Sequence, residues 1–412
     1  MEAKTLEFLR KKFREYYLKN LKEISLPSQF EKREFGFIPF RHGKTVMVRH
    51  KGFKSFREFS DFIVNLIPSD VYYSSAYYKN PSEEKMSEKG WLGADLIFDI
   101  DCDDIQDSCQ KSPAEHKFWR CLDCGETFDE NVSFCPVCNG SRVEEDYWLC
   151  ELCLSRAKDE ALKLFTILEE DFGINQKHIT VVFSGHRGYH LHVEDEAVIS
   201  LGADERKEIV DYIRGVGLNF KAKKVRRNIL STLDISKPSF QGRISRAIYD
   251  LLVESSKKLL ENGLDRKTVK KIEEKRDEIL TWLSNGVEEE VLIKVLGGEG
   301  RWIKIMEKAL AKTVIPIDTV VTTDIHRLIR LPGTLHGKTG LKTFTIPINM
   351  LEEFDPLTDA LAFKDEKVKI KVKISRMLRF NGEIFKLSKG EIITLPLAAA
   401  IFLLARGVAS LT

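Results

Sequence analysis

The sequence has no cysteine outside residues 102–153, and it has no apolar run long enough to cross a membrane. Its longest apolar stretch, residues 395–405, predicts a buried C-terminal helix. An apolar signal segment is also missing at the start, where residues 1–21 have the pattern of a charged amphipathic helix. We therefore expect a cytosolic protein that does not span a membrane and in which the cysteines do not form disulfides.

Net charge is nearly absent as well, since the formal charge is only +2 over 412 residues. The composition alone does not indicate a nucleic-acid-binding protein, so any basic surface must be local, as at residues 221–227. An apolar content of 43% and a charged content of 31% are typical of a soluble globular protein. The length predicts two or three domains rather than one.

Helical and strand patterns alternate along most of the chain, which predicts a mixed α/β (α+β) fold. Residues 204–312 are highly charged and mostly helical in pattern, so we expect a helical insertion in an α/β core of residues 1–203 and 313–412. Residues 102–153 interrupt this core with turn residues and all eight cysteines. The expected core elements are a hairpin at 33–53, a helix at 56–67, strands at 70–78 and 95–101, a helix at 154–173 and a strand–turn–strand unit at 179–193.

The strand predicted at residues 95–101 ends in two aspartates. Side chains alternate along a strand, so Asp99 and Asp101 share one face, about 7 Å apart. At an effective dielectric constant of about 20, repulsion between the two carboxylates costs about 2.4 kcal/mol. A divalent cation between them removes this repulsion, and Mg²⁺ prefers one or two carboxylates together with substrate phosphates. The pair indicates a metal site for phosphoryl transfer, and the alternative is a solvated acidic strand end.

A second polar cluster lies in the turn between the strands predicted at 179–193. Gly185 and Gly188 permit this turn, whose backbone N–H groups are suited to a phosphate. The side-chain donors of the cluster are Ser184, His186, Arg187 and His190. We interpret the cluster as a phosphate site and His192 as a structural histidine, and the alternative is a polar hairpin with surface histidines.

The third polar segment combines one carboxylate with several basic groups. Asp318 precedes residues 324–330, which we expect to form a short helix with a threonine cap. Arg327 and Arg330 are three residues apart and would share a face of that helix, and His336 follows in a turn. This set suits a site that holds a triphosphate and shares a metal, whereas the alternative is an ordinary charged surface.

Because all the cysteines cluster in a chain expected to be cytosolic, they indicate metal binding. Two C-x-x-C turns ten residues apart have the spacing of a zinc ribbon, a closed tetrahedral site that is structural or contacts nucleic acid. Its ligands would be Cys121, Cys124, Cys135 and Cys138. A third pair, Cys150 and Cys153, needs ligands from elsewhere.

At these residues the chain resembles the catalytic (small) subunit of archaeal and eukaryotic DNA primase. Three motifs carry the resemblance in the family's order: "FDID" at 98–101, "SGHRGYH" at 184–190 and "D…HRLIRLPGTLHGKTG" at 318–340. The likeness extends to the C-terminal pattern that ends in "ARGVAS" and is weakest over the helical insertion at 204–312. The resemblance implies the primase (prim-pol) catalytic core as the fold, with a zinc-binding insertion at 102–153.

The resemblance also implies roles for individual residues. Two catalytic ions, Mg²⁺ or Mn²⁺, would be held by Asp99, Asp101 and Asp318. The phosphates of the incoming nucleotide would be contacted by Ser184, Arg187, His190, Arg330 and His336, and a basic nucleotide contact would be Arg49. Tyr72 stands where eukaryotic members have an acidic residue that senses the ribose, so the sequence assigns no preference between ribo- and deoxyribonucleotides.

A second zinc site follows from the family's zinc knuckle. By this likeness its ligands would be Cys109, His116, Cys150 and Cys153, with the four-cysteine ribbon inserted inside it. The alternative pairs Cys150 and Cys153 with one arm of the ribbon. Two structural zinc ions are therefore expected, and Cys102 is left free beside the catalytic pair.

The function implied is template-directed synthesis of short primers on single-stranded DNA from nucleoside triphosphates, for DNA replication. The implied partner is the large regulatory primase subunit, and the implied location is the cytoplasm of an archaeal cell, or the nucleus in a eukaryote. Two alternatives belong to other classes. One is a related polymerase for end joining or lesion bypass, and the other is a non-catalytic, zinc-bearing nucleic-acid-binding subunit.

Overall fold

The strands that carry the acidic and basic motifs pair with one another in a single antiparallel sheet, in the order β15-β10-β11-β6. Apolar side chains at alternate positions of β6, such as Phe98 and Ile100, are completely buried and fix its orientation. The strand–turn–strand prediction for residues 179–193 is confirmed. The strands of this sheet are β6 Leu96–Asp101, β10 Ile179–Phe183, β11 Gly188–Val193 and β15 Phe344–Ile346.

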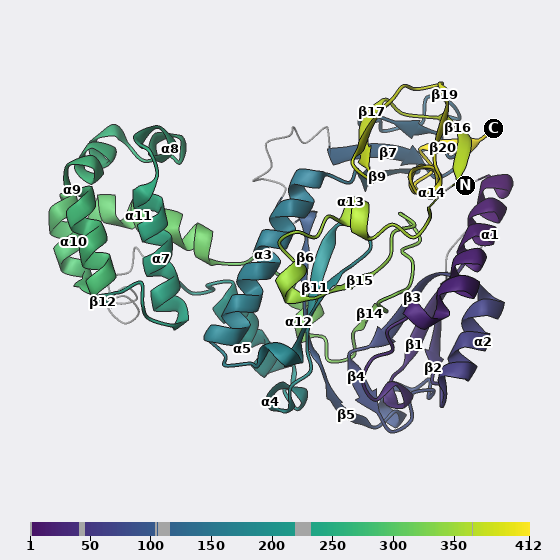
Figure 1. The fold of residues 1–412 in the computed structure, drawn as a ribbon, viewed down its shortest axis with the longest axis horizontal. Helices are drawn as coiled ribbons and strands as arrows, with labels where there is room; N and C mark the ends of the chain where they lie inside the picture. The colour runs from purple at the N-terminus through teal and green to yellow at the C-terminus, as the bar shows by residue number, and fades with distance from the viewer. Residues whose placement is uncertain (1, 41–45, 104, 106–115, 219–231, 365) are drawn as a thin grey trace. The chain divides into compact units, whose positions relative to one another are not determined.

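A second sheet has the order β14-β3-β1-β2 and contains the predicted hairpin and the first part of the strand predicted at 70–78 (Figure 1). The predicted strand is interrupted, because its last residues form β4 Ala76–Tyr78, which pairs with β5 Trp91–Ala94 in a separate sheet. The computed structural model describes residues 2–40, 46–103, 105, 116–218, 232–364 and 366–412. The strands of the second sheet are β1 Phe35–Pro39, β2 Val48–Lys51, β3 Pro68–Ser74 and β14 Leu328–Arg330. Two helices lie beside this sheet, α1 Ala3–Asn20 and α2 Phe56–Leu66.

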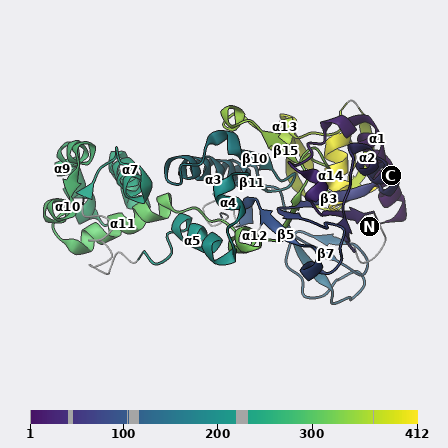
Figure 2. The ribbon, with the colours of Figure 1, turned by 90° about the horizontal axis from the view of Figure 1, so that it is seen from below.

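A long helix, α3 Glu151–Glu170, begins within the third cysteine pair and ends before Gly173, whose positive φ of 68° suits the chain reversal. The C-terminal helix, α14 Leu397–Ala405, is buried at every residue, as predicted. It contacts α1, and the two helices lie close together in both views (Figures 1 and 2). The part of the chain that contains both sheets also has the short helices α4 Glu196–Ile199, α12 Thr319–Thr323 and α13 Pro356–Asp359.

Residues 116–153, the described part of the predicted cysteine-rich insertion, contain a three-stranded sheet in the order β8-β7-β9, followed in sequence by α3. Its strands are β7 Lys117–Cys121, β8 Thr127–Phe128 and β9 Val143–Tyr147. The other strands in the part of the chain that contains both sheets are β4 Ala76–Tyr78, β5 Trp91–Ala94, β16 Lys367–Val372, β17 Arg376–Phe380, β18 Glu383–Leu387, β19 Ile392–Pro396 and β20 Ala409–Leu411.

Chain contacts divide the protein into two units. The unit that holds both sheets comprises Met1–Leu162, Lys177–Arg206 and Asp318–Thr412, and the helical unit comprises Lys163–Gln176 and Lys207–Ile317. The mixed α/β prediction is thus confirmed, while the end of α3 groups with the helical unit. The second segment of the helical unit begins within α5 Ala203–Ile213 and contains β12 Thr232–Leu233, α7 Ser239–Val253, α8 Ser256–Glu261, α9 Arg266–Asn285, β13 Val287–Glu288, α10 Glu289–Leu296 and α11 Glu299–Thr313.

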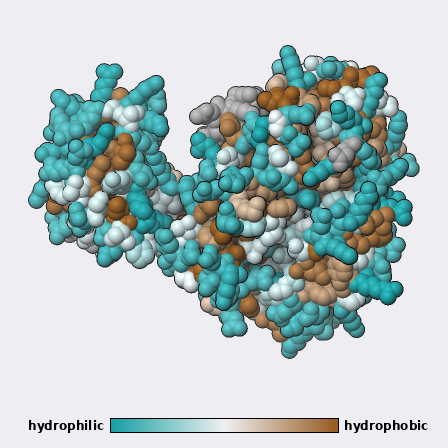
Figure 3. All heavy atoms as spheres, viewed as in Figure 1, coloured by the Kyte–Doolittle hydropathy of each residue, from teal (hydrophilic) through white to brown (hydrophobic). Residues whose placement is uncertain are grey.

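The helical unit has its own apolar core, in which Trp302, Ile248 and Leu283 are completely buried. At its start, Asp171 pairs with Arg243 and accepts a hydrogen bond from the Tyr212 hydroxyl, which explains why the end of α3 belongs to this unit. Hydrophilic side chains cover most of the visible face of each unit (Figure 3). Within the described residues, every helix is too short or too polar to cross a bilayer.

Candidate active site

The two aspartates of β6 lie opposite the histidine strand. In the antiparallel pairing of β6 with β11, Asp99 is opposite His190 and Asp101 is opposite Gly188. Both carboxylates line one cavity of about 260 Å³. The predicted shared face of the pair is therefore present. The residues that line this cavity are Tyr72, Asp99, Asp101, Ser184, His186, Arg187, Gly188, His190, Arg327, Leu328, Ile329, Arg330 and His336.

The turn between β10 and β11 depends on its two glycines and on Ser184. Gly185 has a φ of +79°, a left-handed conformation that favours glycine. A Cβ at Gly188 would lie 2.4 Å from the carbonyl oxygen of Ile100, so a side chain there would force β6 and β11 apart. The Ser184 hydroxyl accepts hydrogen bonds from the backbone N–H groups of His186 and Gly188, each at 3.3 Å. The turn is therefore held in place before any ligand arrives.

Arg187 is held by two carboxylates. Its Nε lies 2.9 Å from Asp101 Oδ1, and its Nη1 lies 2.7 Å from Asp103 Oδ2. The guanidinium also lies 4.9 Å from the ring centroid of Tyr147, which comes from β9 of the cysteine-rich insertion. Burial raises the pKa of Asp101 to about 6, and the charge of Asp99 adds to this effect while Arg187 opposes it. Asp101 is thus a carboxylate whose charge needs a cation.

The histidines of β11 are buried and neutral. Burial, followed by the charges of Arg330 and Arg327, lowers the pKa of His190 to about 3. Its Nε2 lies 3.4 Å from Asp99 Oδ1, so the hydrogen on Nε2 faces the carboxylate. His192 shares a 2.8 Å hydrogen bond with the Tyr73 hydroxyl, in agreement with its interpretation as a structural histidine.

The helix predicted at residues 324–330 is wrong. The chain forms the helix α12 earlier, and Leu328–Arg330 instead form β14, which pairs with β3 at the edge of the second sheet. Arg327 and Arg330 therefore do not share a helical face, although both line the cavity. The spacing of three suggested a helix, but hydrogen bonds to a strand more than 250 residues earlier decide the conformation.

Arg330 is fixed by two residues of β3. Its guanidinium pairs with Asp70 and lies 4.9 Å from the ring centroid of Tyr72. Asp70 also accepts a hydrogen bond from the backbone N–H of Gly337, 3.0 Å away, and so holds the turn that carries His336. No local sequence pattern indicates a role for Asp70, because its partners come from a distant segment.

Asp318 and Arg49 are predicted site residues that are not among the described residues lining the cavity. The backbone N–H of Asp318 donates to the carbonyl oxygen of Asp99 at 3.1 Å, which places it beside β6. The carboxylate of Asp318 accepts hydrogen bonds from backbone N–H groups in the first turn of α12. Among the described residues, Asp318 does not line the cavity. Arg49 also lies outside the lining, where its Nε donates to Glu34 at 3.0 Å.

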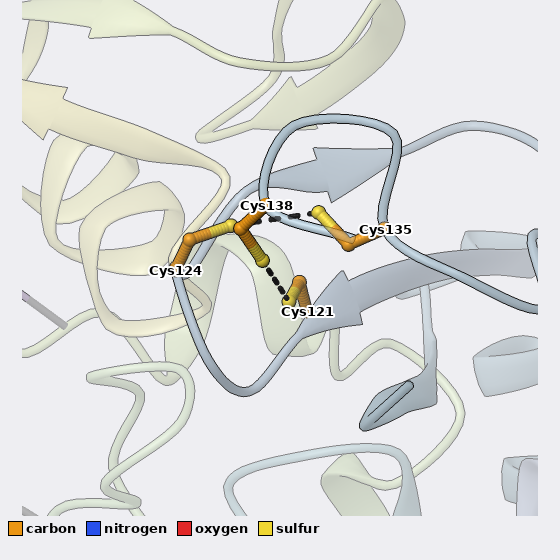
Figure 4. A group of neighbouring side chains, drawn as sticks. All are labelled: Cys121, Cys124, Cys135 and Cys138. Carbon is orange, nitrogen blue, oxygen red and sulfur yellow. Dashed lines mark hydrogen bonds between the residues drawn. The ribbon is translucent and has the colours of Figure 1, made fainter. Parts of the chain in front are cut away.

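Four cysteines of the insertion converge on one point (Figure 4). Their sulfur atoms lie 3.6 Å apart for Cys121 and Cys138, and 3.5 Å apart for Cys124 and Cys135. Zinc–sulfur bonds of about 2.3 Å in a tetrahedron place sulfur atoms about 3.8 Å apart, so these residues fit a zinc ion. The predicted ribbon ligands are thus brought together.

A second group consists of His116, Cys150 and Cys153, whose ligand atoms lie within 4.8 Å of one another. The distance from Cys153 Sγ to His116 Nε2 is 3.5 Å. The third cysteine pair therefore lies with His116 and not with an arm of the ribbon. Cys109, the predicted fourth ligand, lies outside the described residues.

Paired carboxylates that face a donor-rich turn and two arginines, on a mixed α/β fold, make this cavity a candidate phosphate-handling site. Comparison with known proteins makes the assignment specific, because residues 141–349 match the family model of the DNA primase small subunit. The chain is 38% identical to the DNA primase small subunit PriS of Archaeoglobus fulgidus, with 98% of each chain covered. It is 36% identical to the protein of the same name from Methanococcoides burtonii, with 99% of each chain covered.

The chain belongs to the DNA primase small subunit family, the catalytic subunits of archaeal and eukaryotic primase. The resemblance inferred from the three motifs is therefore confirmed. So is the predicted function, that of a catalytic primase subunit and hence a primer-synthesising nucleotidyltransferase.

Proposed function

We propose that nucleotidyl transfer takes place in the cavity between β6, β11 and β14. The observation that carries this proposal is convergence: groups from three distant segments, among them Asp101, Arg187 and Arg330, line one cavity of about 260 Å³. The two carboxylates supply negative charge, whereas the arginines and neutral histidines supply hydrogen-bond donors. This division suits a nucleoside triphosphate together with divalent cations.

Asp99, Asp101 and Asp318 would hold two divalent ions, Mg²⁺ or Mn²⁺. The oxygen-rich donor set fits these hard cations, and a cation bound there would offset the burial and the Asp99 charge that raise the pKa of Asp101. Such ions lower the pKa of an attacking hydroxyl and offset charge on the leaving pyrophosphate. The Asp318 carboxylate is engaged by the first turn of α12. To serve as a ligand, it would use the remaining acceptor positions of its oxygens.

The triphosphate would be bound by Ser184, Arg187, His190, Arg330 and His336. Arg187 is already paired with Asp101 and Asp103, so an incoming phosphate must compete with these carboxylates for its N–H groups. Asp70 keeps Arg330 oriented, which reduces the entropy lost when phosphate binds. We further propose Arg49, whose side chain is 40% exposed on the edge strand β2, as the basic nucleotide contact that the family resemblance implies.

The two ligand groups of the insertion would hold two structural zinc ions, with Cys109 completing the second set. Single-stranded DNA would be the template, and the large primase subunit would be the partner that assists initiation, as in the family of this chain. The site of action would be the cytoplasm of an archaeal cell, in line with the archaeal relatives. DNA polymerase activity would use the same cavity.

The test measures incorporation of labelled nucleotide on primer-free single-stranded DNA, with and without Mg²⁺ or Mn²⁺. Wild-type protein should produce short products that depend on the metal, and Asp99→Asn should produce none. A matched control is Asp61→Asn, which removes an exposed carboxylate on α2 and should retain full activity. Synthesis by Asp99→Asn at the wild-type rate would contradict the proposal. Preferential use of a gapped duplex with a 5′-phosphate would favour the end-joining alternative.

A further inference from the structure

A buried arginine outside the three motifs lies directly behind the cavity. Arg406 follows the last residue of α14, and its side chain is completely enclosed. Its guanidinium lies 5.6 Å from the ring centroid of Phe118 and 5.2 Å from that of Phe402. Its Nη1 lies 3.1 Å from Nε2 of His186, which lines the cavity. Arg406 thus contacts a side chain of the turn between β10 and β11, more than 200 residues earlier in the sequence.

The contact between Arg406 and His186 fixes the hydrogen position on the histidine. A guanidinium has only donors, so His186 Nε2 must be the acceptor in this hydrogen bond. Burial, together with the charges of His336 and Arg406, lowers the pKa of His186 well below its ordinary value, so the ring is neutral near pH 7. In a neutral imidazole that accepts at Nε2, the hydrogen resides on Nδ1. Nδ1 is then the ring nitrogen that has a hydrogen to donate.

The neighbouring histidine carries its hydrogen on the other nitrogen. His336 Nδ1 accepts a hydrogen bond from the backbone N–H of Lys338 at 3.1 Å, so its hydrogen resides on Nε2. The rings of His186 and His336 are stacked, with centroids 4.7 Å apart and an interplanar angle of 22°. The cavity wall therefore offers two neutral N–H donors whose tautomers are set by different neighbours.

Asp146 supports this arrangement from β9 of the cysteine-rich insertion. Its carboxylate lies 3.8 Å from Arg406 Nη2 and 3.7 Å from Lys338 Nζ. The side chain of Asp146 is only 7% exposed, so it provides negative charge where the buried guanidinium needs it. Asp146 is thus linked to both histidines, through Arg406 on one side and through Lys338 on the other.

We propose that Arg406 is a positioning residue for nucleotide binding, which holds His186 in the tautomer that donates from Nδ1 to a triphosphate oxygen. Asp146 in turn holds Arg406. This inference rests on the proposed function, because it assumes that the cavity binds the triphosphate. The other tautomer would direct a lone pair at an anionic ligand, and without Arg406 the ring is free to adopt it.

The first test is kinetic and uses Arg406→Met, which removes the donors and keeps an unbranched side chain. We expect the KM for nucleotide to rise roughly tenfold, the equivalent of one hydrogen bond to a charged group, with a smaller change in kcat. Arg406→Lys keeps one donor and should recover most of the affinity. Asp146→Asn should raise KM by about threefold, since its contact with Arg406 is long.

Arg206→Met is the matched control. Arg206 is equally buried, but its guanidinium donates to the carbonyl oxygens of Ala94, Asp95 and Leu201, none of which lines the cavity. Its replacement should lower the melting temperature without a selective rise in KM. If Arg406→Met loses stability like the control and keeps the wild-type KM, Arg406 is only structural and the inference is overturned.

The second test observes the tautomer directly, by ¹⁵N NMR of protein labelled in the histidine rings. The His186 signals are identified by their absence in His186→Asn. Wild-type protein and Arg406→Lys should show a protonated Nδ1 on His186, and Arg406→Met should shift toward a protonated Nε2. A protonated Nε2 in the wild type overturns the inference even if Arg406→Met does not fold. This measurement needs no nucleotide, whereas a failure of the proposed function would show as wild-type protein that does not incorporate nucleotide.

Discussion

Replacing Asp101 by asparagine should make the metal-free protein more stable near neutral pH, even though it removes an ion pair. Burial raises the pKa of this carboxyl to about 6, against about 3.9 for a solvated aspartate. A raised pKa in the folded state means that folding favours the neutral carboxyl. The stabilisation that the neutral Asp101 carboxyl contributes is complete below about pH 4 and is lost as the pH rises through about 6. Asparagine remains neutral throughout this range.

The magnitude follows from the difference in pKa. A shift of about 2 pKa units corresponds to about 3 kcal/mol at pH 8, and to about half of that at pH 5. The Asp101 side chain is 30% exposed, so solvent screening reduces the expected gain to about 1–2 kcal/mol. Arg187 loses one partner in the variant but keeps Asp103, whose Oδ2 lies 2.7 Å from its Nη1. The guanidinium is therefore not left without a carboxylate.

The assay is urea unfolding of wild-type protein and Asp101→Asn between pH 5 and pH 8, in buffer without added divalent metal. The variant should be the more stable at pH 8, and its advantage should shrink by about half at pH 5. Addition of Mg²⁺ should stabilise the wild type but not the variant, because only the wild type gains ligand-linked stability. A variant that is less stable at pH 8, or a gain that does not change with pH, would refute the electrostatic argument.

Three further outcomes are expected. Arg187→Ala should raise the KM for nucleotide at least tenfold, because a charge-assisted phosphate contact is lost, while fluorescence anisotropy should show unchanged template binding. Cys121→Ser should lower the zinc content, measured by elemental analysis, from two ions to one, and Cys153→Ser should remove the other; equal loss of a single ion in both would mean that they share one site. Arg33→Met should lower the free energy of unfolding by about 3–5 kcal/mol, because it leaves the completely buried Asp95 carboxylate without the guanidinium 2.6 Å away, and an unchanged urea midpoint would contradict this.

Local patterns in the sequence predicted the elements whose conformation depends on neighbouring residues. The alternation at residues 95–101 correctly placed Asp99 and Asp101 on one face, and the glycines near Ser184 correctly marked a turn between two strands. The C-x-x-C spacing likewise predicted that four cysteines lie together, and the structure brings their sulfur atoms close to one another. In each case the signal lies within a few residues of the group that it positions, so it can be found without knowledge of the fold.

Predictions failed or were missing where distant segments decide the outcome. Residues 324–330 have a helical spacing but become a strand because β3 offers hydrogen-bond partners at its edge. Asp70 and Asp103 were not singled out, although they hold Arg330 and Arg187. Arg406 also carried no signal, because its importance follows from a contact more than 200 residues away. Such pairings become visible only when the chain is folded.

The position of β9 suggests how the cysteine-rich insertion influences the reaction without contributing a ligand to the cavity. Tyr147 lies under Arg187, and Asp146 lies between Arg406 and Lys338. The same strand pairs with β7, whose last residue, Cys121, belongs to the four-cysteine group. If a zinc ion holds that group as proposed, it would also hold β9 against Arg187 and Arg406. Such a zinc ion would act on nucleotide binding through packing, at a distance from the carboxylates that would hold the catalytic ions.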